Sequence, residues 1–417
     1  MTDPQHLSQI VEALDDSDPF VAQAAQFALS RQPLLDDLDW TALREPSQRI
    51  GLLAGMRYTG DHQFLEPALA DVDPAVRLMA VRWIADEQLR EYRPHIERAM
   101  GEPVLTPRLF AGYRAALERL DDRGTFTSKP GTSVSQYLRP KLLDPYAPSS
   151  IKVMALQMLT PDTKLLRLDE VRRLLDDADP RVRLEAVRWL CETPDPNRSS
   201  LLAEIAADSR QPAAVRAEAL IGLAADAEQH TQLLNQLASS SDAAVAQEAR
   251  RTLPGPANSP DDRPPVIDLD GWLARLDGQA DALAGRRTFF HPKLGGCYRC
   301  HRVHGRGADI GPDLSDVGRR FDRRALLESI LQPGKEISPR YAAWQVTLAD
   351  GRSLVALLVG ENGGKHRYAD AAGQVTEVDA AQVVDRKMLP LSIMPDGLVH
   401  AITDQELRDL LAYLIDP

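Results

Sequence analysis

The sequence lacks most of the features that would place it in a specialised class. Only 3 of its 417 residues are cysteine, too few for a fold held together by disulfides. No apolar run is long enough to cross a membrane as a helix, and the opening MTDPQHLSQIVEAL has neither the basic nor the apolar stretch of a signal peptide. The net charge of −12 argues against a nucleic-acid partner. With 43% hydrophobic and 26% charged residues, we expect two or three globular domains.

A short pattern recurs through the first 250 residues or so. Its clearest copies are DSDPFVAQAAQFAL from Asp16, DVDPAVRLMAVRWI from Asp71 and DADPRVRLEAVRWL from Asp177, and weaker copies follow. In each clear copy an Asp suits the cap of a helix and the following Pro suits its first turn. Apolar residues then recur at helical spacing, and a pair of such helices must stack on its neighbours to bury its apolar face. The pattern resembles the HEAT repeats, in a short bacterial form, over about residues 5–254.

Four arginines recur in two of the clear copies: Arg77, Arg82, Arg183 and Arg188. One interpretation is a basic ridge that binds an acidic partner. The other, which we favour, is pairing within the chain with the turn aspartates of neighbouring repeats. The tryptophans that follow them, Trp83 and Trp189, are predicted to lie in the core.

Two segments break the repeat pattern. Residues 121–150 are rich in Pro, Gly and Ser and are predicted to form an irregular insertion, either a surface excursion or a binding loop. Residues 255–266 belong to the proline-rich stretch TLPGPANSPDDRPPV, which predicts a semi-rigid linker. We therefore expect a repeat domain over residues 1–254 and a different domain over residues 267–417.

The cysteines divide into one isolated residue and one close pair. Cys191 lies in an apolar helical pattern and is predicted to be a buried free thiol. Cys297, Cys300 and His301 form the sequence CYRCH, and C-x-x-C-H is the attachment signature of c-type haem. In that chemistry the two thiols add to the haem vinyl groups and the histidine becomes the proximal iron ligand. One covalent haem c is therefore the predicted cofactor.

Three other interpretations of the motif compete with haem, and the first, a chance occurrence, is disfavoured in a chain with only 3 cysteines. A zinc ion needs four ligands, and adding His304 to the motif would crowd all four into eight residues. A thioredoxin-like dithiol usually lies where a strand meets a helix, whereas this motif follows a helix-like segment and a short loop. The zinc and dithiol alternatives both stay open at the level of the motif alone.

The sequence on either side of the motif resembles the class I c-type cytochromes. Gly285 and Phe289 have the glycine–aromatic spacing of the N-terminal helix of that family, and Leu410 and Tyr413 resemble the residues that pack against it. The segments CHRVHGRGADIGPDLSDVG, LLESILQPGKEISPRY, TLADGRSLVALLVG and SIMPDGLVHAITDQELRDLLAYL are similar to the haem-binding domain family of Planctomycetes and Verrucomicrobia. That resemblance covers about residues 280–417.

The resemblance implies further site residues. The carbonyl of Pro312 would accept a hydrogen bond from the proximal His301, and Met394, directly before Pro395, would be the distal iron ligand. Met388 is the alternative distal ligand. A His/Met pair raises the reduction potential and suits electron transfer.

One segment departs from a small class I cytochrome. Residues 341–388 are predicted to form a small antiparallel β insertion, with one hairpin turn at Asp350-Gly351 and a second hairpin within KHRYADAAGQVTEV. The insertion would cover one edge of the haem or dock a partner. The predicted fold class is thus mainly α: a HEAT-like α-solenoid followed by an α-helical cytochrome c domain with this insertion.

Together these features predict a monohaem c-type cytochrome that transfers single electrons and is not an enzyme. Its repeats would dock a redox partner protein, either a periplasmic dehydrogenase or an electron acceptor. Because haem is attached to such proteins outside the cytoplasm, we expect an exported, periplasmic protein whose signal peptide is not in this sequence. The alternatives are a haem enzyme of the peroxidase type and a haem-based redox or gas sensor.

The region around the motif is basic in an otherwise acidic chain. Residues 286–340 contain twelve Lys or Arg against six Asp or Glu. This composition predicts either a basic surface that steers an acidic partner to the motif, or a solvated face together with arginines that serve buried cofactor carboxylates.

Overall fold

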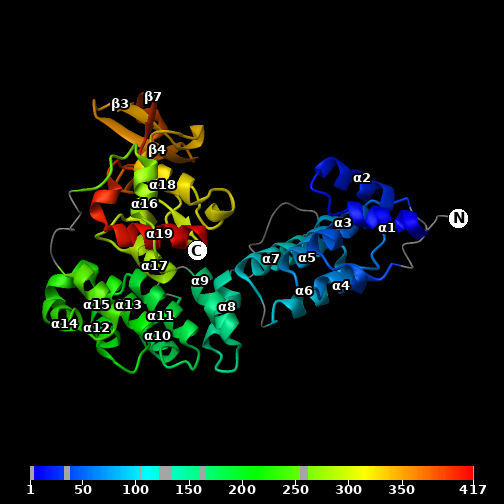
Figure 1. Cartoon of the computed structure of the whole chain (residues 1–417), viewed down its shortest axis with the longest axis horizontal. Helices are drawn as coiled ribbons and strands as arrows, with labels where there is room; N and C mark the ends of the chain where they lie inside the picture. The colour runs from blue at the N-terminus through cyan, green and yellow to red at the C-terminus, as the bar shows by residue number, and fades with distance from the viewer. Residues whose placement is uncertain are drawn as a thin grey trace. The chain divides into compact units, whose positions relative to one another are not determined.

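The computed structural model describes residues 4–31, 38–102, 105–121, 134–159, 161, 165–253 and 262–416. The described chain is mainly α-helical and has a small antiparallel sheet towards its C-terminus (Figure 1). It divides into two compact units, residues 1–159 and residues 160–417. No helix in these ranges is long and apolar enough to span a bilayer.

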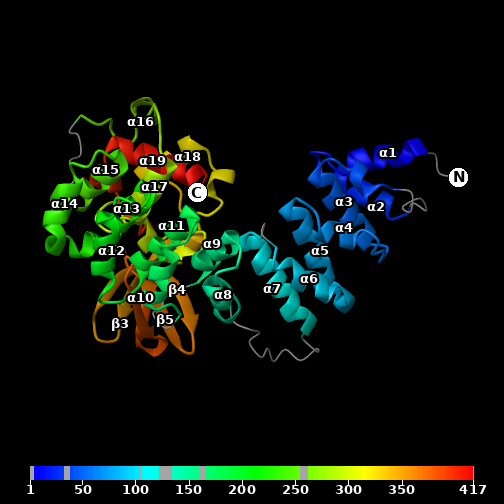
Figure 2. The ribbon, with the colours of Figure 1, turned by 90° about the horizontal axis from the view of Figure 1, so that it is seen from below.

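The first unit is built from helices that pack in two rows. Its helices are α1 (Pro4–Ala13), α2 (Pro19–Leu29), α3 (Pro46–Arg57), α4 (Leu65–Leu69), α5 (Pro74–Glu87), α6 (Arg93–Ala99), α7 (Pro107–Asp121), α8 (Val134–Leu143) and α9 (Ser149–Met158). Helices α2, α3, α5 and α7 pack in succession, and α4 and α6 pack beside them (Figure 2). The predicted caps are confirmed: the side chains of Asp18 and Asp73 accept backbone N–H groups at the starts of α2 and α5. Trp83 is fully buried, as predicted.

The second unit begins with the same kind of packing. Its first helices are α10 (Leu168–Leu174), α11 (Pro180–Glu192), α12 (Arg198–Ala207), α13 (Ala213–Gly222), α14 (Thr231–Leu237) and α15 (Ala243–Thr252). Helices α11, α13 and α15 pack in succession, and α10, α12 and α14 pack against them. Asp179 and Asp242 cap α11 and α15 through their side chains, and Trp189 is fully buried.

The remainder of the second unit combines helices with the sheet. The helices are α16 (Leu269–Arg275), α17 (Ala282–Phe290), α18 (Arg323–Leu331) and α19 (Asp404–Ile415). Two short strands, β1 (Arg302–Val303) and β2 (Arg306–Gly307), form a hairpin. Helix α17 packs along α19 and also contacts α13. The core between these helices includes Trp272, Phe289, Leu327 and Leu407, each at most 1% exposed.

The expected domain boundary at residue 254 stays a prediction. The two compact units divide after Leu159, because α17 rests on α13 and joins α10–α15 to the C-terminal helices in one unit. The C-terminal end of the expected linker, residues 262–266, is bound to the helices that follow it. Residues 254–261 lie outside the described residues, but Arg263 pairs with Asp404 at 2.9 Å, and the Trp272 indole N–H donates to the carbonyl of Pro265.

The insertion expected over residues 121–150 is not irregular throughout. Residues 122–133 lie outside the described residues, whereas Val134–Leu143 forms helix α8. Leu138 and Leu142, one helical turn apart, are buried, and the burial of this apolar stripe outweighs the presence of Pro140 inside the helix.

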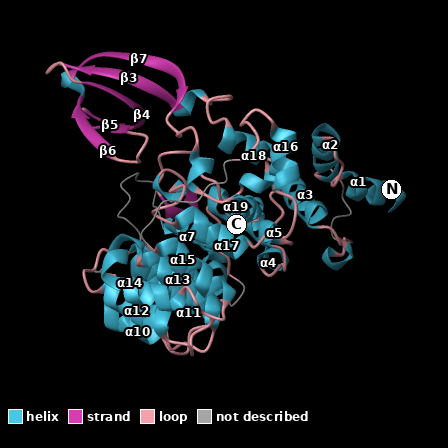
Figure 3. Ribbon diagram, turned by 60° about the vertical axis from the view of Figure 1, so that its left-hand side comes forward, coloured by secondary structure: helices cyan, strands magenta, loops and turns pink. Residues whose placement is uncertain are grey.

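The expected β insertion is confirmed as a five-stranded antiparallel sheet (Figure 3). Its strands are β3 (Ala342–Leu348), β4 (Ser353–Asn362), β5 (Lys365–Ala369), β6 (Val375–Asp379) and β7 (Val383–Ser392), in the order β6-β5-β4-β3-β7. Both predicted hairpins are present, between β3 and β4 and between β5 and β6. Gly351 has a φ of 85° at the first turn, a conformation that favours glycine. The sheet ends at Ser392, four residues beyond the expected limit.

Candidate functional site

The helices α17 and α19 cross at a glycine. A Cβ atom at Gly285 would lie 1.9 Å from the carbonyl oxygen of Asp409 and 2.9 Å from the backbone nitrogen of Leu410. One turn further, the rings of Phe289 and Tyr413 meet edge to face with centroids 5.9 Å apart. The four residues singled out in the sequence therefore do form the contact between the two helices, and this contact supports the segment that follows α17.

The C-x-x-C-H motif is a tight loop after α17. Cys297–Arg299 form one 3₁₀ turn, and the backbone N–H of His301 donates to the carbonyl of Cys297 at 2.9 Å. The chain then folds back on the motif through β1 and β2. The N–H groups of Ile310 and Gly311 both donate to the carbonyl of Cys300, at 3.0 and 2.7 Å. This return places the residues before Pro312 directly against the histidine.

His301 is held by the hydrogen bond predicted for it. Its Nδ1 lies 2.9 Å from the carbonyl oxygen of Pro312, and because a carbonyl only accepts, Nδ1 carries the proton. Burial lowers the pKa of His301, although the bond to Pro312 acts in the opposite direction. The imidazole is therefore neutral at pH 7, and its Nε2 carries the lone pair that a metal would need.

Gly311 is the residue that lets the histidine lie this close to the returning chain. A Cβ atom there would lie 2.8 Å from Cε1 and 2.9 Å from Nδ1 of His301, which is closer than a side chain tolerates. The glycine thus leaves a recess that the imidazole fills, and the ring is confined between Gly311 and the carbonyl of Pro312.

The two motif thiols lie among apolar residues. Cys297 packs on the helical core that contains Phe289, and Cys300 packs on a smaller cluster with Ile310 and Leu357. Burial raises the pKa of Cys297 to about 11 and also raises that of Cys300, so both are thiols at neutral pH. A redox dithiol needs a lowered pKa, so these surroundings do not favour the thioredoxin-like alternative.

The structure gives the zinc alternative no support. Among the residues that it describes, no group of three or more His, Cys, Asp or Glu side chains is placed to hold a metal ion. All three cysteines are free. Cys191 was expected to be buried, but it is only half-buried. The pKa of Cys191 is raised to about 12, mainly by desolvation, which agrees with an inert thiol.

The two candidate distal methionines lie in different settings. Met394 is half-buried in the bend that follows β7, and its backbone N–H donates to the Ser392 hydroxyl at 3.1 Å. Met388 lies within β7, paired with Trp344 of β3, and its side chain is 47% exposed. The ligand role of Met394 stays a prediction.

The β insertion lies against the motif loop. Leu357 of β4 and Ala369 of β5 are buried in the same cluster as Ile310, beside Cys300. At the turn between β5 and β6, a Cβ atom at Gly373 would lie 2.7 Å from the carbonyl oxygen of Arg299. The insertion therefore covers the Cys300 side of the loop.

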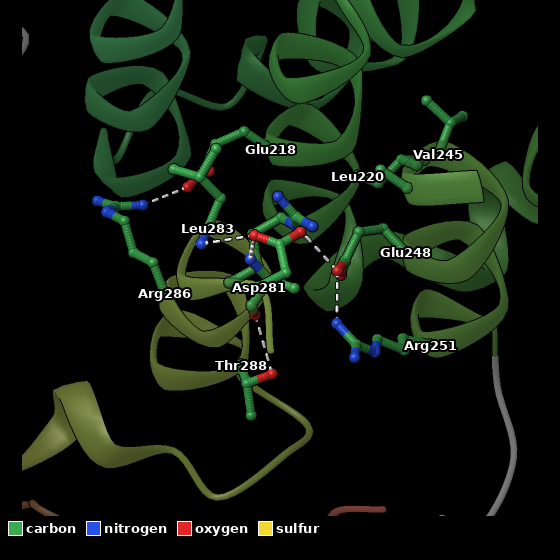
Figure 4. A network of polar contacts seen from close by, with 12 residues as sticks. Glu218, Leu220, Val245, Glu248, Arg251, Asp281, Leu283, Arg286 and Thr288 are labelled. Carbon is green, nitrogen blue, oxygen red and sulfur yellow. Dashed lines mark hydrogen bonds and ion pairs between the residues drawn. The ribbon is translucent and has the colours of Figure 1, made fainter. Parts of the chain in front are cut away.

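Buried ion pairs connect the motif-bearing domain to the helices before it (Figure 4). Arg286 pairs with Glu218 at 2.5 Å and Arg287 with Glu248 at 2.9 Å. Arg306, beside the motif, lies 3.0 Å from Glu192. The expectation of a basic surface around the motif is therefore wrong for these three arginines, since they are buried and paired with carboxylates of α11, α13 and α15.

Sequence reasoning missed these carboxylates, although a signal was present. Glu185, Glu218 and Glu248 each stand six residues after the residue that caps their helix, namely Asp179, Pro212 and Asp242. A carboxylate repeated at one helical position, next to apolar neighbours, indicates a shared buried face.

The favoured interpretation of the recurring arginines is wrong in its partners: Arg77 and Arg188 pair within the chain, but with glutamates and not with the turn aspartates. Arg77 pairs with Glu102 at 2.7 Å and Arg188 with Glu185 at 2.5 Å, while Arg183 lies 3.5 Å from the Gln211 side chain. Arg82 is exposed and has no hydrogen-bond or ion-pair partner in the described part of the chain.

The chain was compared with known proteins. It matches no protein-family model, and a search of curated proteins finds no significant relative.

Proposed function

We propose that the protein is a monohaem c-type cytochrome that transfers single electrons, with its haem domain carried on a HEAT-like solenoid. One observation carries this proposal: the hydrogen bond between His301 Nδ1 and the Pro312 carbonyl, in the loop that also contains Cys297 and Cys300. It gives a neutral imidazole in a fixed orientation next to two free thiols. Those are the donors that a covalently attached haem requires.

The surroundings of these donors fit such a group. The cysteine side chains lie in apolar clusters on two sides of the loop, which suits the apolar faces of a porphyrin. The recess at Gly311 lets the imidazole lie against the backbone, and the crossing of α17 and α19 at Gly285 supports the loop from below. Where bound, a haem would supply an iron that alternates between the ferric and ferrous states.

The chain's own residues would then act on that iron indirectly. Pro312 holds the His301 ring and raises the basicity of its free nitrogen, because its carbonyl accepts a hydrogen bond from the Nδ1–H group. The buried neighbours of Cys297 and Cys300 exclude water, which disfavours the more highly charged oxidised state. Met394 is proposed as the distal ligand, because its thioether would stabilise the ferrous state further.

The proposed partners are a redox protein that delivers electrons, such as a dehydrogenase, and an acceptor that removes them. The buried pairs from Arg286 and Arg287 to Glu218 and Glu248 support a role for the repeats as a rigid holder of the haem domain. The periplasm is the proposed compartment, because haem attachment of this type takes place outside the cytoplasm.

The intact mass of the purified protein tests haem attachment. The chain, fitted with an export signal, is expressed together with a cytochrome-maturation system, alongside C297S/C300S and the control C191S. We expect the wild type and C191S to gain the mass of one haem and C297S/C300S to have the mass of the bare chain. A bare wild-type chain, in cells that load a reference cytochrome, would refute the proposal.

Two further assays separate electron transfer from the rival functions. Steady turnover of peroxide with an electron donor would show a haem enzyme of the peroxidase type. Binding of carbon monoxide to the reduced protein at neutral pH would show an open sixth position, as in a gas sensor. We expect neither result.

A further inference from the structure

One face of the repeat helices in the second unit is covered by another helix. The face carries Glu185, Glu218 and Glu248, each six residues after the residue that caps α11, α13 or α15, and all three are buried. The covering helix, α17, places Arg286 and Arg287 on two of these carboxylates. This face therefore binds a short helix whose two arginines pair with its carboxylates.

The equivalent face of the first unit has a different composition. Six residues after the cap, α5 has Met79 and α7 has Gly112 in place of the glutamates. Nine residues after the cap, α5 has Arg82 where α11 has Arg188. The side chain of Arg188 is only 10% exposed, whereas Arg82 is exposed. The equivalent face of the first unit thus lacks the glutamates, and Arg82 is exposed on it.

This face is hollowed into a groove with a volume of about 490 Å³, which we call the α5/α7 groove. Its apolar lining includes Leu78, Met79, Ala115 and Ala116. A Cβ atom at Gly112 would lie 2.6 Å from Leu78 Cδ2, so the missing side chain brings α7 close to α5 and leaves the floor of the groove smooth.

Three arginines surround this apolar floor: Arg82, Arg108 and Arg119. All three are exposed. Arg119 donates to the carbonyl of Ala85, and neither Arg82 nor Arg108 has an ion-pair or hydrogen-bond partner among the described residues. The one carboxylate in the lining, Asp86, lies 3.1 Å from Arg57. The groove therefore combines an apolar floor with the guanidinium groups of Arg82 and Arg108, which are available to bind anionic side chains.

We propose that the α5/α7 groove binds an acidic amphipathic helix of a partner protein. The apolar side of that helix would cover the floor, as α17 packs on α13, and its Asp and Glu residues would pair with Arg82, Arg108 and Arg119. The roles of the two charges are the reverse of those in the second unit, where arginines of the covering helix meet the carboxylates of Glu218 and Glu248. This proposal names the surface for the docking role of the repeats and rests on that part of the proposed function. Its test requires no haem.

The probes are two synthetic helical peptides of about 18 residues, which is about five turns. Both carry Leu and Ala along one face; the acidic peptide has Glu on the flanking positions and the matched peptide has Lys there. Binding to the full chain is followed by fluorescence anisotropy at low and at moderate salt, for the wild type and for R82E/R108E. R90E/R98E is the control, since it reverses two exposed arginines of the first unit that do not line the groove.

We expect the wild type and R90E/R98E to bind the acidic peptide, with an affinity that falls as salt rises, and to bind the Lys peptide at least about tenfold more weakly. R82E/R108E should reverse this preference. Equal binding of both peptides, or an unchanged preference in R82E/R108E, would overturn the proposal. So would a dimer in sedimentation analysis that R82E/R108E dissolves, because the occupant would then be a second copy of the chain. The same affinities are expected with and without haem, so a failed groove and a failed haem site are distinguishable.

Discussion

Arg286 of α17 and Glu218 of α13 form a buried ion pair, with 2.5 Å between Nη1 and Oε1. Arg188 of α11 lies 3.6 Å from the same carboxylate. Burial alone would raise the pKa of Glu218, but Arg286, Arg188 and Arg287 outweigh that effect and hold it below the ordinary value. One carboxylate thus serves three cations at the contact between the repeat helices and the motif-bearing domain.

Removing that carboxylate is expected to destabilise the second unit strongly. Glu218→Gln keeps the size of the side chain but leaves Arg286 buried without its counterion and Arg188 with Glu185 alone, which costs about 3–5 kcal/mol. Urea unfolding of the full chain gives the loss of free energy. The control is Glu204→Gln, since Glu204 pairs with Arg172 at the surface and both side chains are more than half exposed. This variant should lose less than about 1 kcal/mol of unfolding free energy. Equal losses of unfolding free energy in both variants would show that the buried ion pairs stabilise the chain no more than the exposed one does.

The helix crossing at Gly285 is expected to tolerate no side chain. Gly285→Ala would place a Cβ atom 1.9 Å from the carbonyl oxygen of Asp409, so α17 and α19 must separate, at a cost of about 1–3 kcal/mol. Gly334→Ala is the matched control, because a Cβ atom there meets nothing within 4 Å. Thermal unfolding followed by circular dichroism compares the two. If both variants melt with the wild type, the close crossing is not present in solution.

His291 is expected to make stability depend on pH. It is fully buried, and its pKa is lowered to about 3, first by desolvation and then by Arg251 and Lys293. The unfolded chain restores the ordinary pKa of 6.5, so between these values it binds a proton that the folded chain does not. Stability therefore falls as the pH is lowered through that window, by up to about 1.4 kcal/mol per pH unit.

His291→Gln removes this dependence while keeping an acceptor for the Lys293 N–H, which lies 3.1 Å from His291 Nδ1. Urea midpoints measured at pH 7 and pH 5 should fall further for the wild type than for the variant. Carboxylates such as Glu248 titrate in both proteins, so the difference between the two falls isolates the histidine. A parallel fall in both proteins would contradict a depressed pKa at His291.

The distal ligand assignment makes a spectroscopic prediction for the haem-loaded protein. Met394→Ala should abolish the far-red charge-transfer band of methionine-ligated ferric haem and lower the reduction potential, because the thioether stabilises the ferrous state. Met388→Ala should leave both unchanged, since that side chain lies in β7 opposite Trp344. Survival of the band in Met394→Ala would show that another residue ligates the iron.

Local signals made part of this structure predictable. The helix starts at Asp73 and Asp179 are predictable because each capping Asp is followed directly by a Pro. The turn at Gly351 is predictable from the Asp-Gly pair in the sequence. The bond from His301 to Pro312 spans eleven residues, but family resemblance supplied it.

Other features depend on contacts between distant parts of the chain. Glu218 and Arg286 are 68 residues apart, and no local pattern shows which carboxylate meets which arginine. For that reason the packing of α13 on the C-terminal helix α17 could not be predicted from the sequence. Helix α8 was missed because residues 121–150 are rich in Pro, Gly and Ser, whereas burial of Leu138 and Leu142 stabilises the helix.

A spectroelectrochemical titration of the haem-loaded protein tests the central claim most directly. We predict one haem per chain and a single reversible transition with a one-electron slope of about 59 mV per decade, which is lost in C297S/C300S and retained in C191S. A chain that shows no redox-active haem absorbance in this titration, or a transition that survives in C297S/C300S, would contradict it.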